Sequence, residues 1–525
     1  MNRLLTSLIF SLVASAAIGA DQSRPKLVVG IMVDQLRSDY IEFLQTRLGE
    51  KGFKRLLNNG VYLRDVDFGL TSPDKVSATA LLFTGAYPQS SGVPSAEVYD
   101  ASAAKYRRIL DDGNTMGNYT SETYSPAGLL LSTVSDEIMI DGAGLGAVYS
   151  LAVDPQQAII MAGHAGNSAA WINDNTGRWA TTTYYKDVPA SLNRFNQSAQ
   201  LSSRLDTMQW RPSIPLERYQ GVPAQKRYYP FRYTFPRSDR NVYRMFLDSP
   251  LANREITDMA IDYLQSLQLG KRGDAIDMLN LGYTAAPYKY VKDGDYRLEL
   301  QDTYLRLDAQ LARLFDAIDK SVGLANTLIF LSSTGYYDDA IADDAKYRIP
   351  TGDFSAKRAV SLINAYLSAK YGMGDYIDTF AGHSLYLDHK ALEAKKLEAA
   401  AIADDVRDFL CRMSGVTDAY TIRDILGQDT PGLQKLRRSI NPKTAGDIYV
   451  EFQPGWNLVE DLTYPVKKLP VRSTVATTPV LIMGPGLAPA TITAPVDATA
   501  IAPALCGAMH IRSPNGATRR AVALQ

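Results

Sequence analysis

The chain has 525 residues, of which 46% are hydrophobic and 21% charged, the composition of an ordinary globular protein. Its formal net charge is only −1, which argues against a nucleic-acid partner, because phosphate backbones are bound by clustered lysine and arginine side chains. A chain of this length buries most of the surface that its unfolded form exposes, so its stability requires no disulfides or structural metals.

The N-terminus has the pattern of a secretory signal peptide. Arg3 supplies a positive charge, residues 4–17 are apolar, and small residues up to Ala20 offer cleavage sites. We therefore predict a signal peptide at residues 1–20 and a bacterial protein that is periplasmic or secreted; a membrane anchor is the alternative. No second apolar run of about 20 residues follows, so we expect no transmembrane segment in the mature chain.

Strands and helices alternate from residue 25 onward. Residues 27–33 form a continuous apolar run, which predicts a strand buried on both faces. Apolar residues at helical spacing over 40–59 predict a helix that ends at Asn59–Gly60. This alternation predicts an α/β fold, a three-layer sandwich with a mainly parallel central sheet. Further strands are expected at 325–331 and 479–483, and further helices at 126–141, 253–268, 301–320 and 356–371.

Two stretches interrupt the alternation. Residues 165–250 are rich in Tyr, Arg, Pro and Asn and have weak periodicity, so we expect a cap-like excursion over the surface. Residues 384–452 have the pattern of a small α+β insertion. Its expected elements are strands at 384–387, 420–422 and 448–452 and a helix over 391–413.

The two cysteines, Cys411 and Cys506, leave two possibilities open. In an oxidising compartment they could form a disulfide, or both could remain free thiols in the folded chain. The sequence does not show whether they meet, because a disulfide depends on the distance and direction of the two side chains.

Asp34 is the first candidate functional residue, because it follows a predicted strand and ligands of open α/β sheets bind beyond the carboxyl ends of strands. The segment around it, KLVVGIMVDQLR at 26–37, resembles the opening strand of the alkaline phosphatase superfamily. The resemblance is to the branch of periplasmic phosphatases and type I phosphodiesterases/nucleotide pyrophosphatases. Six further segments agree in order and spacing: GFKRLLNNGV at 52–61, LFTGAYP at 82–88, AGHAGNSAAW at 162–171, TTYY at 182–185, DTYLRLD at 302–308 and TLIFLS at 327–332.

The resemblance implies an alkaline-phosphatase-like domain over residues 25–525 and phosphoryl transfer with two zinc ions and a Thr or Ser nucleophile. Asp34 matches the first metal-binding Asp of that family. An ungapped count places Lys75 at the nucleophile position. Thr71 or Ser72 is a weak candidate that requires a four-residue shift; the alternative is that Ser72 or Asp74 caps the following helix.

The other implied zinc-ligand positions carry unsuitable residues. The family supplies three Asp and three His, because zinc binds His nitrogen and carboxylate oxygen. The only four histidines of the chain lie outside the segments where the resemblance places ligands. Asp338 and Asp339 follow one of these positions, but at the wrong spacing. The residues at the implied ligand positions are Pro287, Val291, Thr334, Gly335 and, least certainly aligned, Lys468.

The implied phosphate-contacting positions are changed as well. Ala96, Asp154 and Gln156 stand where the resemblance implies an Asn, a Lys and an Arg. An aspartate in place of a cation repels phosphate. These replacements and the missing ligands lead to one prediction: the chain is a non-catalytic pseudophosphatase, a binding or structural envelope protein with no cofactor and with an unknown protein or glycan partner.

The alternative is an active metal-dependent phosphatase or phosphodiesterase with a rearranged site. Oxygen ligands at the carboxyl edge of the sheet would suit Mg²⁺ or Ca²⁺ better than Zn²⁺ in such a site. Its candidate residues are Asp34, Thr71, Ser72, Asp74, Asp338 and Asp339. The enzyme question therefore remains open at this point, with the non-catalytic prediction preferred.

Overall fold

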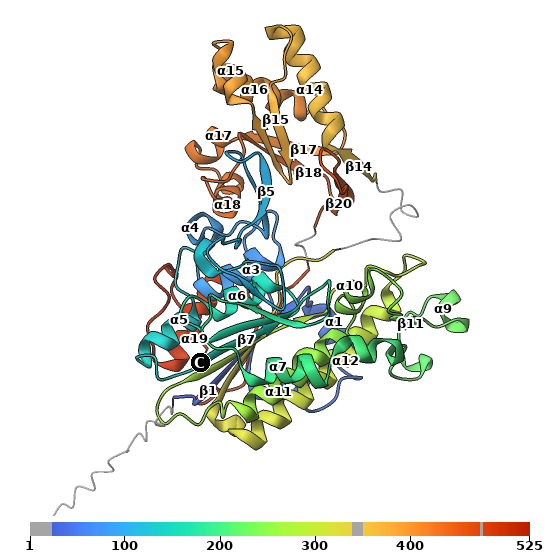
Figure 1. Cartoon of the computed structure of the whole chain (residues 1–525), viewed down its shortest axis with the longest axis vertical. Coiled ribbons are helices and arrows are strands. Elements are labelled where there is room, and N and C mark those ends of the chain that lie inside the picture. Colours follow the sequence, from blue (N-terminus) through green and yellow to red (C-terminus); the bar gives the residue numbers. More distant parts are fainter. Residues whose placement is uncertain (1–23, 339–349, 473–475, 525) are drawn as a thin grey trace, which may run out of the picture.

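The computed structural model describes residues 24–338, 350–472 and 476–524. Its centre is a ten-stranded sheet with helices on both faces (Figure 1). Strands β13, β1, β12, β7 and β8 pair in parallel, and β21 and β9 run antiparallel to their neighbours. The sheet is therefore mainly parallel, which confirms the predicted α/β fold. In spatial order its strands are β22 (Ala490–Ile492), β2 (Val61–Leu63), β21 (Val480–Met483), β13 (Thr327–Ser332), β1 (Leu27–Asp34), β12 (Asp277–Thr284), β7 (Val148–Ala152), β8 (Ser168–Ile172), β9 (Trp179–Thr182) and β6 (Gly117–Asn118).

Two hydrophobic cores lie on opposite faces of this sheet. Along β1, Val29 and Ile31 pack into one core, whereas Val28 and Met32 pack into the other, because successive strand side chains point to opposite faces. Burial of both faces explains the continuous apolar run of β1. The first core is covered by α1 (Ser38–Leu44), α2 (Phe53–Asn59), α7 (Ala190–Ser198), α11 (Leu251–Ser266) and α12 (Arg297–Ser321). The second is covered by α3 (Lys75–Thr84), α5 (Val134–Asp141), α6 (Pro155–Ala162) and α19 (Ile501–Met509).

The helix predicted over 40–59 is two helices, α1 and α2, with a break at residues 45–52. The carboxylate of Asp308, on α12, fixes this break by accepting hydrogen bonds from the amides of Gly49 (2.7 Å) and Phe53 (2.8 Å). A Cβ at Gly52 would lie 2.1 Å from Asp308 Oδ1, so the chain needs glycine at this approach. The break depends on a contact with α12, more than 250 residues away, and local spacing does not reveal it.

Most other predicted elements are present with shifted ends. The strands predicted at 325–331 and 479–483 are β13 and β21, and Asp34 is the last residue of β1 rather than the first beyond it. The helices predicted at 253–268, 301–320 and 356–371 are α11, α12 and α14 (Ala356–Tyr371). The helix predicted over 126–141 begins only at Val134, where Thr133 and Asp136 form a capping box.

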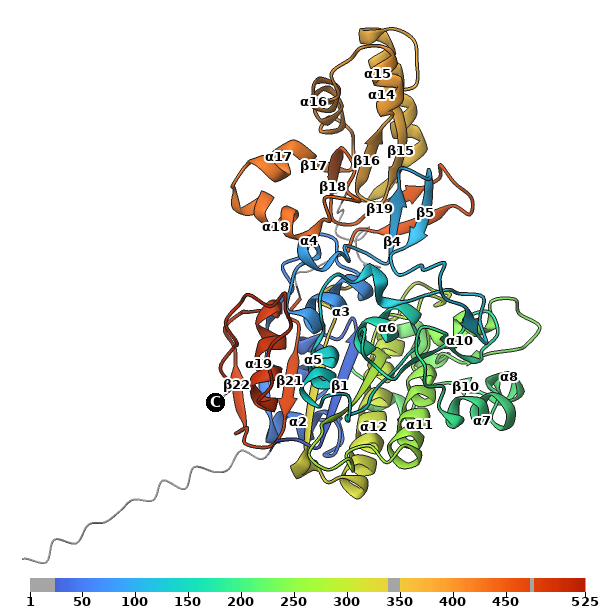
Figure 2. The same ribbon diagram turned by 60° about the vertical axis from the view of Figure 1, so that its left-hand side comes forward.

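Residues 352–470 form a small unit above the central sheet (Figures 1 and 2). It has an antiparallel sheet in the order β15-β16-β18-β17 and a second sheet in the order β14-β19-β20. The predicted insertion at 384–452 lies within it. Its strands are β14 (Gly352–Ser355), β15 (Ile377–Ala381), β16 (Ser384–Leu387), β17 (Val416–Thr421), β18 (Ile448–Phe452), β19 (Trp456–Glu460) and β20 (Lys467–Pro470). In addition to α14, its helices are α15 (His389–Ala394), α16 (Ala399–Leu410), α17 (Ile422–Gly427) and α18 (Pro431–Ser439).

The stretch predicted as a cap-like excursion, 165–250, begins with β8 and β9 of the central sheet. The remainder, after β9, consists of short helices and a two-stranded ribbon beside α11 and α12 (Figure 1). These elements are α8 (Leu201–Arg204), β10 (Gln209–Trp210), α9 (Ala224–Tyr228), β11 (Tyr233–Thr234) and α10 (Val242–Leu247). The remaining short elements of the main body are β3 (Val66–Asp67), α4 (Pro88–Ser91), β4 (Glu97–Asp100), β5 (Lys105–Arg108) and β23 (Val496–Asp497).

Polar contacts join the small unit to the main body near the start of α3. Ser439 Oγ accepts a hydrogen bond from the Thr71 amide at 3.0 Å, and Tyr449 OH lies 2.7 Å from Ser72 Oγ. A second contact between the main body and the small unit is made by Tyr99 of the β4–β5 hairpin, which donates a hydrogen bond to Asp378 at 3.1 Å. The segment that leads into α3 is therefore held by the small unit as well as by the main body.

Among the described residues, no helix is long and apolar enough to cross a membrane. The predicted signal peptide at residues 1–20 lies outside the described part of the chain. Cys411 and Cys506 are both free; Cys411 is exposed and Cys506 is buried. The disulfide that the sequence left open is therefore absent from the structure.

His164 has a structural role beside α5. Its Nδ1 lies 3.1 Å from Asp136 Oδ2 and its Nε2 lies 2.9 Å from the Leu129 carbonyl oxygen, so both ring nitrogens face acceptors. An imidazole that donates from both nitrogens is protonated. The hydrogen bond to Asp136 outweighs burial and raises the pKa of His164 above its ordinary value of 6.5.

We expect His164→Gln to lower the free energy of unfolding by about 1 kcal/mol at about pH 6 and by less at about pH 9. Because the folded-state pKa is raised, the stabilisation is complete below the unfolded pKa and is lost as the pH rises through the folded one. Urea unfolding of both proteins at the two pH values measures the difference. His510→Asn is the control, since His510 is exposed in a left-handed helix cap that Asn tolerates. A loss that does not change with pH would contradict a charged His164.

Candidate functional site

A cavity of about 340 Å³ lies beyond the carboxyl ends of β1 and β12, beside the first turn of α3. This is the place at which open α/β sheets bind ligands. Aspartates from five separate segments meet basic side chains around it, and we call it the Asp34 cavity. The charged residues that line it are Asp34, Asp74, Lys75, Arg108, Asp154, Asp248, Lys289, Asp338 and Arg472.

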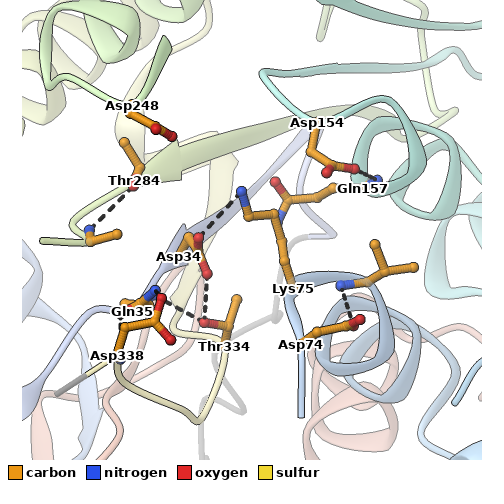
Figure 3. Close-up of polar contacts among 12 residues, drawn as sticks. Asp34, Gln35, Asp74, Lys75, Asp154, Gln157, Asp248, Thr284, Thr334 and Asp338 are labelled. Atoms are coloured by element: carbon orange, nitrogen blue, oxygen red, sulfur yellow. Dashed lines mark hydrogen bonds and ion pairs between the residues drawn. The ribbon is translucent and has the colours of Figure 1, made fainter. Parts of the chain in front are cut away.

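Asp34 is buried at the end of β1, and its carboxylate is surrounded by donors (Figure 3). The hydroxyls of Thr334 and Tyr336 donate to Oδ1 at 3.0 and 2.8 Å, and Lys75 Nζ lies 3.2 Å from Oδ2. Burial would raise the pKa of Asp34, but Lys75 together with Tyr336 and Arg472 holds it below its ordinary value. Asp34 is therefore an ionised carboxylate whose two oxygens both have partners in the protein.

Lys75 is the first residue of α3, and Asp74 caps that helix. The Asp74 carboxylate accepts hydrogen bonds from the amides of Val76 (3.0 Å) and Ser77 (2.8 Å). This cap directs the Lys75 side chain into the cavity, where 26% of it is exposed. Burial would lower the pKa of Lys75, but the charges of Asp34, Asp154 and Asp248 raise it above its ordinary value. These carboxylates thus favour the charged ammonium form of Lys75, which has no free electron pair for nucleophilic attack.

Arg472 brings a second cation to the cavity from the segment that leaves the small unit. Its Nη1 donates to the Pro73 carbonyl oxygen at 2.8 Å, and its Nε lies 3.3 Å from Asp338 Oδ1. The guanidinium also stacks over the Tyr336 ring at 4.3 Å from the centroid. Asp338 is held in turn by Gln35, whose Nε2 donates to Oδ2 at 2.8 Å.

Two further aspartates face Lys75 from the other side of the cavity (Figure 3). Asp154 is the N-cap of α6 and accepts a hydrogen bond from the Gln157 amide at 3.0 Å. Asp248 follows α10, and its Oδ1 lies 3.6 Å from Lys289 Nζ. Cations and carboxylates therefore alternate around the cavity, and three of the cations are each paired with one of its carboxylates.

The two hydroxyls predicted as weak nucleophile candidates are not among the described residues that line the cavity. Thr71 Oγ1 accepts a hydrogen bond from Tyr449 OH at 3.2 Å, and Ser72 Oγ lies 2.7 Å from the same hydroxyl. Both side chains thus serve the contact with the small unit. The alternative, that this segment caps the helix, is confirmed for Asp74.

The residues at the implied zinc-ligand positions have other contacts. Thr334 donates to Asp34 and accepts from the Gln35 amide at 2.9 Å. Gly335 has φ +73°, and a Cβ there would lie 2.4 Å from Phe68 Cδ2. Pro287 lines the cavity, whereas Val291 is half-buried against the first core. Lys468 is exposed on β20, where Nζ lies 2.9 Å from Asp353. Asp339 lies outside the described residues.

The implied phosphate-contacting positions differ in the same way. Ala96 and Asp154 line the cavity, and the Ala96 amide donates to Asp74 Oδ2 at 2.6 Å. Gln156 is buried away from it; its Nε2 donates to the Ala96 carbonyl oxygen at 3.1 Å, and its Oε1 accepts from the Leu110 amide at 3.2 Å. Gln156 therefore supports the wall of the cavity from behind.

Sequence reasoning missed Arg108, Arg472, Tyr336, Asp248 and Lys289. Arg472 lies only four residues beyond Lys468, where an ungapped count placed the last ligand, so a search for any charged residue in that segment would have found it. Tyr336 directly follows the Thr334–Gly335 pair, but a tyrosine is no zinc ligand of this family and gave no signal. Asp248 and Lys289 come from stretches without a recognised motif.

The two-zinc centre that the resemblance implies does not fit these residues. Within residues 24–338, 350–472 and 476–524, no three His, Cys, Asp or Glu side chains are placed to hold a metal ion. Asp34 accepts hydrogen bonds or an ion pair at both oxygens. Of the histidines, His164 pairs with Asp136 and His389 with Asp447, both away from the cavity.

Comparison with known proteins shows relatives along nearly the whole chain. The family model "Type I phosphodiesterase / nucleotide pyrophosphatase" matches residues 28–476. Alkaline phosphatase PafA of Elizabethkingia meningoseptica is 28% identical over 97% of both chains. Alkaline phosphatase PhoV of Synechococcus elongatus is 26% identical over 95% of this chain and 92% of its own. The crystal structure of wild-type PafA matches with a TM-score of 0.82 over 95% of this chain and 98% of that chain.

These relatives contradict the prediction of a non-catalytic pseudophosphatase, because PafA and PhoV, which match this chain over most of its length, are named as alkaline phosphatases. The prediction rested on ligand positions counted without gaps and on the number of histidines, four in the whole chain. The least certainly counted position, Lys468, lies away from the cavity that Arg472 lines. The match over residues 28–476 supports the implied relationship itself. The chain belongs to the type I phosphodiesterase/nucleotide pyrophosphatase family of the alkaline phosphatase superfamily.

Proposed function

We propose that this chain is a phosphoric ester hydrolase whose substrate binds in the Asp34 cavity. The observation that carries the proposal is the pair of cations, Lys75 and Arg472, that line one cavity at the carboxyl edge of the sheet. The family membership and the phosphatase names of the relatives support the reaction class. Export by the predicted signal peptide at residues 1–20 is part of the same proposal.

The two cations suit the charge of a phosphate ester. Phosphoryl transfer depends mostly on positioning and on electrostatic stabilisation of the oxygens around phosphorus. The Lys75 ammonium is held by Asp34, so it is already oriented before a substrate arrives. The planar guanidinium of Arg472 is suited to two phosphate oxygens at once. No step proposed here passes through a metal ion, because the donor set does not fit one.

Water is the nucleophile in this proposal, since Thr71 and Ser72 face Tyr449 and Lys75 stays protonated. The oxygen of water forms the new bond to phosphorus while the ester P–O bond breaks. Asp154 accepts the proton from the attacking water, and the leaving alkoxide takes a proton from solvent. Carboxylates serve as general bases when they lie within reach of the water, and Asp154 lines the same cavity as the two cations.

The first prediction concerns activity. We expect the purified mature protein to hydrolyse p-nitrophenyl phosphate or bis(p-nitrophenyl) phosphate, and Lys75→Met to lower kcat/KM by about 10²–10³-fold, because one charge-stabilising donor is removed. Release of p-nitrophenol measures both rates. Lys51→Met is the control, since Lys51 forms an exposed ion pair with Asp316 at 2.9 Å, away from the cavity. Hydrolysis by the wild type no faster than by Lys75→Met, with either substrate, would contradict the proposed function.

The second prediction isolates the proton acceptor. Asp154→Asn keeps a good N-cap for α6 but removes the basic carboxylate, so we expect kcat to fall by about 10²-fold or more while thermal stability changes little. Steady-state kinetics and a melting curve measure the two effects. Asp388→Asn is the matched control, because Asp388 caps α15 in the small unit through the Ala391 amide. Full turnover by the Asp154→Asn variant would show that a group other than Asp154 accepts the proton.

A further inference from the structure

The disagreement between the zinc chemistry of the family and this donor set has a specific structural cause. Asp34, at the position that matches the first metal-binding Asp, points both oxygens at protein donors. The donor at Oδ2 is an ammonium, Lys75 Nζ at 3.2 Å. Either an ammonium or a metal ion can balance the charge of a carboxylate oxygen. Here the side chain of Lys75 supplies the ammonium.

A second fixed cation completes the arrangement. Arg472 is anchored by the Pro73 carbonyl oxygen, by Asp338 and by the Tyr336 ring. Tyr336 also donates to Asp34, so one side chain contacts both Arg472 and the carboxylate partner of Lys75. Lys75 and Arg472 line the same cavity, and protein groups hold each of them in place. Such pre-oriented charges bind an anion without the cost of ordering flexible side chains.

The amides of the α3 N-terminus add little to this site. The Asp74 carboxylate already accepts hydrogen bonds from the Val76 and Ser77 amides. An oxyanion in the cavity would therefore be bound by side chains and not by the backbone amides at the N-terminus of α3.

From these contacts we propose that Lys75 and Arg472 form a metal-independent site for a tetrahedral oxyanion, in which the Lys75 ammonium on Asp34 takes the place of a metal ion. The inference rests on the proposed function for the identity of the ligand, a phosphate group. It extends that function by stating that phosphate binding requires no divalent cation.

The test measures binding rather than turnover. The purified wild-type protein is treated with EDTA, its metal content is determined by elemental analysis, and inorganic phosphate is titrated by calorimetry with EDTA present. We expect less than stoichiometric metal and a phosphate affinity that EDTA changes by less than about twofold, whereas Lys75→Met weakens it by about tenfold or more. Lys51→Met, which alters an exposed pair, should bind as the wild type does.

A folding control keeps the test decisive. Lys75→Met leaves the Asp34 carboxylate without its cation, so the double variant Asp34→Asn/Lys75→Met, which removes both charges, is measured beside it. It should fold and still lose phosphate binding. Phosphate binding that appears only with added Zn²⁺ or Mg²⁺, or that survives in the double variant, would overturn the inference.

The outcomes also separate this inference from the proposed function. Phosphate binding in EDTA without hydrolysis of either ester would leave the site standing and reject the hydrolase. Hydrolysis that depends on an added divalent metal would leave the hydrolase standing and reject the metal-independent site.

Discussion

The carboxylate of Asp34 is buried at the end of the central strand, and an ionised carboxylate in such a place must find partners within the protein. Its partners come from two segments: Lys75 from the start of α3, and Thr334 and Tyr336 from the loop after β13. One charge therefore holds a helix and a loop against β1. The form of the cavity follows from this requirement, because Asp34, Lys75 and Tyr336 all line it.

Three of the cations that line the cavity are each paired with a carboxylate of its wall. Lys75 faces Asp34, Arg472 faces Asp338, and Lys289 faces Asp248. An anionic ligand must share cations that already have partners, which favours groups with several charged oxygens that reach two cations together. This arrangement differs from a metal centre, in which ligands are gathered around one concentrated charge.

The sequence was sufficient for the sheet but not for the cavity. The apolar run of β1 and the spacing along α12 and α14 follow local periodicity, and the structure has these elements. The division of residues 40–59 into α1 and α2 depends on Asp308, which contacts them from a distant helix. Long-range contacts of this kind leave no local pattern.

The same reason explains the errors at the site. Asp34 and Lys75 were found because motif spacing fixes them relative to a strand and a helix. Arg472 was missed because it lies after the small unit, where a count without gaps loses its register. Thr71 and Ser72 were weak candidates because of their hydroxyls, but both contact Tyr449, which lies far along the chain, and neither lines the cavity.

The path of the chain through Arg472 has a mechanical consequence. Arg472 stands just beyond β20, where the chain returns from the small unit, and its guanidinium is bonded to Pro73 beside α3. Ser72, one residue earlier, is bonded to Tyr449 of the same unit. A rigid-body tilt of the small unit would therefore change the cavity, because it would move Arg472 relative to Lys75. The orientation of the small unit would in this way affect the electrostatic field inside the Asp34 cavity.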